Sequence, residues 1–298
     1  MKVLSFGSLN IDYVYKVDHF VQKGETLSSK SLNVFSGGKG LNQSIALAKA
    51  GVETYHAGAI GEDGKFLLEI LEDAGVDTSC VKILSDERTG NAIIQNDEDG
   101  DNCILLYGGA NQAITKAQVD AVLSRFDAGD YLVLQNEINE LPYMMTKAHE
   151  KGMKIVLNPS PMNEKILALP LNMVDYFLLN EVEAEQVLQW KPDSEDDKDV
   201  LAAALAAKFP NAKIVLTVGS AGSIYTDGDK HFRQASFRVK AVDTTAAGDT
   251  FSGFFIAGIL CGMTEEEAME RASKAAAIAV TRPGAAPSIP TKAEVDSF

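Results

Sequence analysis

The chain of 298 residues is acidic: 42 Asp and Glu against 27 Lys and Arg give a formal net charge of −15. An acidic surface repels phosphate backbones, so nucleic acid is not expected as a partner, and a site for a polyanion has to concentrate positive potential locally. The length suffices for one large α/β domain with an extensive core.

Three cysteines, Cys80, Cys103 and Cys261, are widely spaced and show no metal-ligand pattern. The first residues run directly into a strand pattern and not into a signal peptide. The longest apolar run, 251–263, is too short and too rich in glycine to span a bilayer. These features favour a cytoplasmic protein with no membrane partner.

Strand and helix patterns alternate along most of the chain. Short runs that are apolar on both faces, as in buried parallel strands, occur at Val3–Phe6, Tyr131–Leu134, Lys154–Leu157, Tyr176–Leu179 and Ile214–Val218. Helical patterns occur at Lys65–Ala74, Lys116–Arg125, Pro142–Lys151 and Val200–Lys208. The acidic run Asp193–Asp199 fits a solvated helix start. This order predicts a mostly parallel sheet with helices on both faces.

Two regions interrupt the alternation. Asp12–Phe35 and Thr89–Tyr107 are strand-like and have no crossover helix, and Asp99-Gly100 has the composition of a hairpin turn. They predict a small separate β-layer. An excursion at the edge of the main sheet is the alternative.

The most informative segment is Val242-Asp-Thr-Thr-Ala-Ala-Gly-Asp-Thr-Phe251. Small residues and a glycine lead into Asp249, where a helical pattern begins. Small residues allow close approach to a ligand, and the free N–H groups of a helix start attract anions. A carboxylate at that point is explained if Asp249 takes a proton from a nucleophile attacking a phosphoryl group held by those amides. An ordinary N-capping Asp is the alternative.

A second segment, Phe35-Ser-Gly-Gly-Lys-Gly-Leu-Asn-Gln-Ser-Ile-Ala46, places three glycines and Lys39 before another helical pattern. Together the two segments resemble the two signature regions of the ribokinase family of carbohydrate kinases, also called the PfkB family. Shorter matches follow along the whole chain in the family's order: Asn10 and Asp12, Glu137, Leu157–Pro161, Asn180–Glu183, Thr217–Gly222 and Ala279–Ser288.

The resemblance implies a ribokinase-like three-layer α/β/α fold, with residues 1–298 forming a single kinase domain. Insertions at about 12–35 and 89–107 would form a β-sheet lid over the sugar, with Gly108-Gly109 as one hinge. A lid with two apolar faces, carrying Tyr13, Tyr15 and Val17, cannot bury both within one chain, so we expect a homodimer formed lid to lid. A monomer whose lid curls back on the core is the alternative.

The implied activity is ATP-dependent phosphorylation of the terminal hydroxymethyl group of a small sugar, with D-ribose, giving D-ribose 5-phosphate, as the first expectation. Fructose, deoxyribose, a sugar acid or a nucleoside remain alternatives. A rival from another class is a non-catalytic sugar-binding regulator, against which the retained Asp249 argues. A Rossmann dehydrogenase shares the alternation but needs a glycine fingerprint that is missing here.

The resemblance also implies roles for individual residues. Asp249 would be the base, and the amides of Ala246, Ala247 and Gly248 the anion hole. Sugar binding would fall to Asn10, Asp12, Gly38, Lys39, Gly40, Asn42, Glu137 and Asp249. From the residues alone, Asn10 and Asp12 fit a turn equally well, and Glu137 fits a solvated loop acid.

ATP, Mg²⁺ and K⁺ are the implied cofactors. The nucleotide would contact Asn180, Glu183, Thr217, Gly219, Ser220, Ala221, Gly222, Gly248 and Ser273, with Asn180 and Glu183 organising Mg²⁺. A K⁺ site would comprise Asp243, Thr245, Ala279, Arg282, Gly284 and Ser288. Without the resemblance, Asn180 is a helix cap and 217–222 an ordinary glycine turn. Two departures are Ser273, where close relatives carry His near the adenine, and Pro283, which replaces a Lys.

Overall fold

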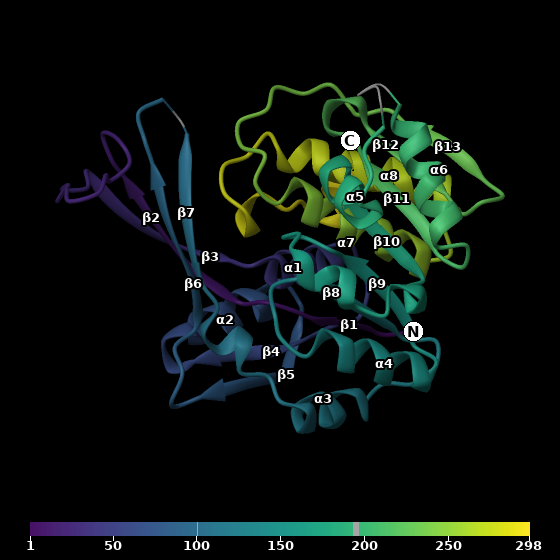
Figure 1. Cartoon of the computed structure of the whole chain (residues 1–298), viewed down its shortest axis with the longest axis horizontal. Coiled ribbons are helices and arrows are strands. Elements are labelled where there is room, and N and C mark those ends of the chain that lie inside the picture. The colour runs from purple at the N-terminus through teal and green to yellow at the C-terminus, as the bar shows by residue number, and fades with distance from the viewer. Residues whose placement is uncertain (100, 193–196) are drawn as a thin grey trace.

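The computed structural model describes residues 1–99, 101–192 and 197–298. Gly100 of the expected hairpin turn and residues 193–196 of the acidic run lie outside the described residues. The expected fold class is confirmed: a mostly parallel central sheet lies between two layers of helices, and a small second sheet stands to one side (Figure 1).

The central sheet has nine strands in the order β13-β12-β11-β10-β9-β8-β1-β4-β5. Their bounds are β1 Val3–Phe6, β4 Thr54–Gly61, β5 Asp77–Leu84, β8 Tyr131–Gln135, β9 Lys154–Asn158, β10 Tyr176–Asn180, β11 Lys213–Thr217, β12 Ser223–Thr226 and β13 His231–Gln234. Pairing is parallel from β11 to β5, whereas β11, β12 and β13 are antiparallel. The five strands expected from apolar runs all occur.

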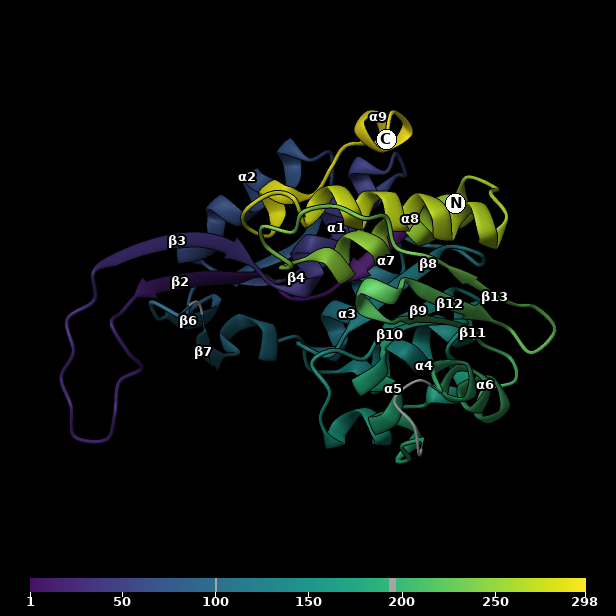
Figure 2. The same ribbon diagram turned by 90° about the horizontal axis from the view of Figure 1, so that it is seen from above.

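Helices cover both faces of this sheet (Figure 2). Their bounds are α1 Lys39–Lys49, α2 Lys65–Asp73, α3 Lys116–Leu123, α4 Leu141–Lys151, α5 Glu181–Leu188, α6 Lys198–Lys208, α7 Ala247–Leu260, α8 Glu265–Ala279 and α9 Lys292–Asp296. Two separate apolar clusters form the core, one with α3 to α6 and the other with α1, α2, α7 and α8. Among the helices of the described residues, none combines the length and apolarity needed to cross a bilayer.

The small sheet is formed by β2 Asn10–Lys16, β3 Ser31–Gly37, β6 Gly90–Asn96 and β7 Asn102–Tyr107, in the order β3-β2-β6-β7. It projects from one side of the molecule (Figure 2), and β2 follows β1 after only residues 7–9. Much of it is exposed: Leu105 is 67% and Leu106 56% accessible. Tyr13 and Tyr15 are half-buried. The separate β-layer expected from 12–35 and 89–107 is thus present, although β2 and β3 extend two residues beyond the first range.

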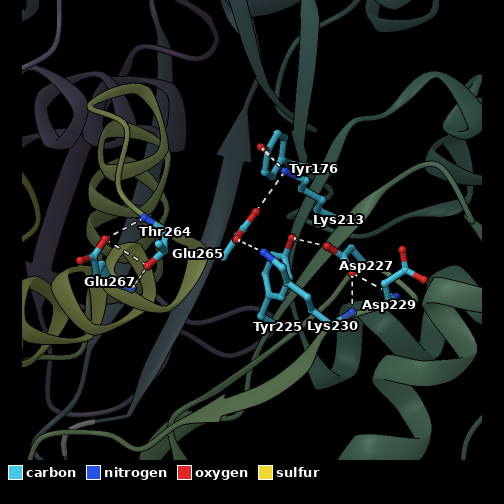
Figure 3. Close-up of polar contacts among 9 residues, drawn as sticks. All are labelled: Tyr176, Lys213, Tyr225, Asp227, Asp229, Lys230, Thr264, Glu265 and Glu267. Carbon is cyan, nitrogen blue, oxygen red and sulfur yellow. Dashed lines mark hydrogen bonds and ion pairs between the residues drawn. The ribbon is translucent and has the colours of Figure 1, made fainter.

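An ion-pair cluster holds the start of α8 against the sheet edge. The Glu265 carboxylate forms ion pairs with Lys213 Nζ at 3.3 Å and with Lys230 Nζ at 2.8 Å (Figure 3). These contacts join the start of α8 to the start of β11 and to the β12–β13 turn. Both lysines lower the pKa of Glu265, and Lys230 has the larger effect. Thr264 and Glu267 close the helix start with a reciprocal capping box. One face of α8 carries only small residues, Ala268, Ala272, Ala275 and Ala279, and is fully buried.

Candidate active site

A cavity of ≈ 250 Å³ lies where the carboxyl ends of β9, β10 and β11 meet the start of α7. Loops at the carboxyl ends of parallel strands are where open α/β sheets bind ligands. Polar groups dominate its lining: Lys39, Asn158, Ser160, Asn180, Glu183, Thr217, Thr244, Asp249 and Ser252, with the backbones of Ala246 and Gly248. Segments from both signature regions therefore converge on one cavity.

Three helices begin at this cavity, and two of the starts are already occupied by protein groups. At α1, the amide of Lys39 donates to the Glu137 carboxylate at 2.8 Å and the amide of Gly40 donates to the Ser8 hydroxyl at 3.2 Å. At α5, Asn180 and Glu183 form a reciprocal capping box, at 2.9 and 3.1 Å. The helix cap interpreted for Asn180 is therefore present, and its residues also line the cavity.

The start of α7 is open. Ala246 is the N-cap residue with a left-handed φ of 60°, and no side chain caps it. Among the described residues, the amides of Gly248 and Asp249 donate to no acceptor, whereas Ala247 donates weakly to Thr244 at 3.3 Å. A helix start with unused N–H groups attracts an anion. Of the three helix starts at this cavity, the one at α7 is therefore open to an anion.

Space is kept free at Gly248. A Cβ added there would meet no heavy atom within 4 Å, and its φ lies outside the left-handed region. The glycine is therefore required neither by close packing nor by backbone strain. Its missing side chain leaves room beside the open amides.

Asp249 lies in the first turn of α7, since the helix begins at Ala247 and not at Asp249 as the sequence pattern suggested. The N-cap alternative for Asp249 is wrong, because its side chain turns to α1 and not to its own helix start. Asn42 donates to its Oδ2 at 3.1 Å and Gln43 to its Oδ1 at 2.9 Å. Asp249 is 7% exposed. The carboxylate is thus held at the cavity wall beside the open amides.

Lys39 is the cation of the site. Burial lowers its pKa, but the negative charges of Asp249, Glu137 and Glu183 outweigh burial and leave the pKa raised. Burial raises the pKa of Glu137, against hydrogen bonds from Ser8 and from the Lys39 amide. Lys39 thus stays charged among three acids, as a group that binds phosphate must.

Two polar side chains, Asn10 and Asp12, stand at the start of β2, where the small sheet begins. Burial, and then the charge of Glu137, raise the pKa of Asp12 to about 6. Asn10 is 8% exposed, and its Oδ1 accepts from Asn111 at 2.7 Å, which leaves its NH₂ group available to a ligand. Gly38 has a φ of 97°, and Gly40 lies so close to Ser8 that a Cβ would stand 2.4 Å from the Ser8 amide nitrogen.

Only some of the residues expected to bind the nucleotide line the cavity. Thr217 lines the cavity, and Gly219–Ala221 form a 3-10 turn directly after β11. Gly222 cannot be replaced without strain, because its φ is 104° and a Cβ would stand 2.0 Å from the Gln234 carbonyl oxygen. Ser273 is buried on α8, which packs against β12 and β13, and lies outside the cavity lining.

Three of the six residues expected to bind K⁺, Asp243, Thr245 and Gly284, are linked by hydrogen bonds. Asp243 accepts from the amides of Thr245 at 2.8 Å and Gly284 at 2.9 Å. Burial would raise the pKa of Asp243, but these hydrogen bonds outweigh it and lower the pKa. The carbonyls of Asp243, Thr245 and Gly284 accept no hydrogen bond from the described residues. Unused carbonyl oxygens suit a weakly hydrated monovalent cation, so the donor set fits.

Some polar residues of the site escaped the sequence reasoning. Asn158, Ser160, Thr244 and Ser252 line the cavity, and Gln43 contacts Asp249 in its wall. Ser8, Asn111 and Gln135 contact Glu137, Asn10 and Gln43 in turn. Gln43 directly follows Asn42, and Gln135 ends a predicted strand two residues before Glu137, so their positions were the available signals. A cluster of three or more His, Cys, Asp or Glu able to hold a metal is absent from the described parts of the chain.

An α/β fold with an anion-binding helix start, a buried carboxylate and a cation in one cavity defines a phosphoryl-transfer enzyme. Residues 1–292 match the model of the pfkB family of carbohydrate kinases. A ribokinase of Haemophilus influenzae is 34% identical, over 98% of this chain and 96% of its own length. The chain belongs to the pfkB family and is an ATP-dependent carbohydrate kinase.

Solved structures agree with this assignment. A ribokinase of Cryptococcus neoformans in complex with ADP has a TM-score of 0.89 and 32% identity, covering 99% of both chains. A ribokinase of Arabidopsis thaliana complexed with ribose and ATP has a TM-score of 0.87 and 29% identity, covering 99% of this chain and 97% of that one.

Proposed function

We propose that the protein transfers the γ-phosphoryl group of ATP to the 5-hydroxyl of D-ribose. The observation that carries the proposal is the Asp249 carboxylate held beside the open amides of α7, the arrangement needed to deprotonate a hydroxyl next to a bound phosphoryl group. The similarity to ribokinases, one of them complexed with ribose and ATP, supports ribose as the sugar.

In the proposed reaction, the sugar hydroxyl oxygen attacks the γ-phosphorus. The new O–P bond forms as the bond to the bridging oxygen of ATP breaks, and that oxygen leaves on ADP with the electron pair. The hydroxyl proton passes to Asp249, while the amides of Ala246, Ala247 and Gly248 and the charge of Lys39 stabilise the migrating phosphoryl group, the Ala247 amide giving up its weak bond to the Thr244 carbonyl.

Each remaining group has a proposed position. Asn10, Asp12, Gly38, Lys39, Gly40, Asn42 and Glu137 would surround the sugar. Thr217, Gly219, Ser220, Ala221, Gly222 and Ser273 would lie along the nucleotide. Asn180 and Glu183, whose oxygens suit a hard cation, would hold the hydrated Mg²⁺, which neutralises phosphate charge when bound. K⁺ would bind at Asp243, Thr245, Ala279, Arg282, Gly284 and Ser288 and order the loop before α7.

We further propose that residues 1–298 act as one kinase domain and that the small sheet closes over the sugar as a lid. A closed site keeps water from accepting the phosphoryl group. Gly109, with a φ of 48°, lies at the end of β7 where a hinge would be needed. The exposed apolar residues of the lid support a homodimer formed lid to lid. Three free thiols and the need for ATP support a cytoplasmic location.

A phosphorylation assay tests the proposal. Purified protein with ATP, Mg²⁺ and K⁺ would be offered D-ribose, deoxyribose, fructose, a sugar acid and a nucleoside, with ADP release and the phosphorylated product both measured. We expect the highest kcat/KM for D-ribose and a product phosphorylated at the 5-position. A higher kcat/KM for another member of the panel would replace ribose, and sugar binding without any turnover would identify a regulator.

A further inference from the structure

Two glutamines to which the family resemblance assigns no role are aligned behind Asp249: Gln43 belongs to the second signature segment, and Gln135 lies outside both segments. Gln43 of α1 donates through Nε2 to Asp249 Oδ1 at 2.9 Å, and its own Oε1 accepts from Gln135 Nε2 at 2.7 Å. Gln135 is the last residue of β8. Both side chains are buried, Gln43 to 1% and Gln135 to 0% exposure. A line of amides thus runs from the central sheet to the base.

The direction of this line is dictated by chemistry. An ionised carboxylate only accepts hydrogen bonds, so Gln43 must turn its NH₂ group toward Asp249. That leaves its carbonyl oxygen on the other side, where only a donor can satisfy it. Gln135 supplies that donor. A buried amide with no alternative partner keeps one orientation, since turning it over would place two acceptors against each other at Asp249 and two donors against each other at Gln135.

Close helix packing sets the register of these contacts. One turn after Asp249, Gly253 of α7 lies against α1: a Cβ there would stand 2.4 Å from the Ala46 Cβ and 2.9 Å from the Leu47 amide nitrogen. Ala46 and Leu47 lie one turn after Asn42 and Gln43. The two helices therefore run parallel at closest approach, and the same pairing one turn earlier brings both amides of α1 to the carboxylate.

We propose that Gln43 and Gln135 are positioning residues that orient the Asp249 carboxylate for proton transfer, Gln43 by direct contact and Gln135 by fixing which end of the Gln43 amide faces the base. The proposal rests on the proposed function, because it assigns Asp249 as the base. It predicts effects on turnover and not on the binding of either substrate, since neither glutamine is needed to hold sugar or ATP.

The sharpest variant is Gln135→Glu, which replaces one NH₂ group by an oxygen. Its carboxylate cannot donate to Gln43 Oε1, so the Gln43 amide should turn over and present its oxygen to Asp249. We expect kcat to fall at least about tenfold, with KM for sugar and for ATP within about twofold. Gln43→Leu removes the donor outright and should give a similar fall. Gln135→Leu leaves the Gln43 amide free to turn and should fall less.

The matched control is Gln118→Leu. Gln118 of α3 is a half-buried glutamine whose Nε2 donates to the Gly58 carbonyl at 2.8 Å, on the other face of the sheet. The Gln118→Leu variant should lose about as much thermal stability as the Gln43 and Gln135 variants but should keep its kcat. If kcat in Gln118→Leu falls as far as in Gln43→Leu, the loss at the site is general destabilisation and the proposal is overturned.

Two comparisons separate this proposal from the function on which it rests. The double variant Gln43→Leu, Gln135→Leu should lower kcat no further than Gln43→Leu alone, because both glutamines act through the one contact to Asp249. If the two losses of kcat add, the positioning role of Gln135 through Gln43 is overturned. In an Asp249→Asn background, Gln43→Leu should have no further effect on residual turnover. If Asp249→Asn is itself nearly fully active, the proposed base is wrong. If it is inactive while Gln43→Leu and Gln135→Glu turn over normally, the positioning role alone is refuted.

Discussion

The carboxyl group of Asp12 lies directly against the backbone of Gly37, so that a Cβ at Gly37 would stand 2.1 Å from Asp12 Oδ2. The two residues belong to adjacent antiparallel strands, β2 and β3, and share one face of the small sheet. A side chain at position 37 would displace the carboxyl group. Burial, and then the charge of Glu137, raise the pKa of this carboxyl group to about 6.

Asp12 should therefore make stability depend on pH. Its pKa is raised from 3.8 in the unfolded chain to about 6 in the folded protein. The group stabilises the fold while protonated, and this contribution is lost as the pH rises from about 4 through 6. We expect Asp12→Asn, which cannot ionise, to raise the free energy of unfolding at pH 8, and the gain to shrink at pH 5, in urea titrations without sugar. A gain of equal size at both pH values would contradict this.

The same substitution should weaken sugar binding, because a carboxylate accepts hydrogen bonds from hydroxyl groups and the replacement amide accepts fewer. In calorimetry, ribose affinity of the unchanged protein should rise as the pH increases through about 6. Asp12→Asn should bind ribose more weakly and lose that pH dependence. A pH dependence that persists in Asp12→Asn would point to Glu137 instead.

Replacing the base should abolish turnover but not binding. We expect Asp249→Ala and Asp249→Asn to lower kcat by at least about a hundredfold. Ribose binding, measured by calorimetry, should survive in Asp249→Asn, because the other sugar-contacting groups are unchanged. Near-normal turnover in either variant would remove Asp249 from the base role.

Gly248→Ala should separate stability from activity. The added methyl group meets no protein atom, and alanine loses less backbone freedom than glycine on folding, so the free energy of unfolding should rise by about 0.4–1 kcal/mol. The methyl group enters the space beside the open amides, so kcat/KM for ATP should fall at least about tenfold. Thermal unfolding and steady-state kinetics on one preparation measure both. Unchanged kinetics would show that the phosphoryl group lies elsewhere.

K⁺ should activate the enzyme and Na⁺ should do so poorly, by ordering the loop that leads into α7. Rates would be compared in K⁺, Na⁺ and choline salts at equal ionic strength, with Mg²⁺ constant. Asp243→Asn, which disturbs the contacts to Thr245 and Gly284, should reduce the activation. Equal rates with and without K⁺ would count against the site.

The protein should be a dimer through its small sheet. Light scattering at micromolar concentration should give about twice the chain mass of 32.0 kDa. Leu105→Lys, a charge on the most exposed apolar residue of the four strands, should favour the monomer. Val200→Lys, at a residue of α6 that is 49% exposed, is the matched control and should leave the mass found by light scattering unchanged. An active monomer of the unchanged protein would contradict the assembly.

Local patterns in the sequence were enough for five strands of the central sheet and for the two glycine-rich helix starts. Val3–Phe6 and Tyr131–Leu134 are apolar on both faces because their strands are buried on both faces, and this shows in any short window. Four strands escaped. Half of the residues of β5 and of the edge strand β13 are exposed, β4 is rich in glycine and alanine, and β12 is short and has polar Ser and Thr at its ends.

Only the tertiary structure decided which helix start remains open and what holds the base. The sequence gives α1, α5 and α7 comparable starts, but Glu137 occupies the first from 98 positions away, while the capping box closes the second. Gln43 meets Asp249 across 206 positions, and Gln135 meets Gln43 across 92. Contacts of this kind leave no periodicity in the chain, because they depend on how α1, α7 and β8 pack and not on the residues beside them. Local composition therefore predicted where the chemistry lies, and packing decided how its groups are oriented.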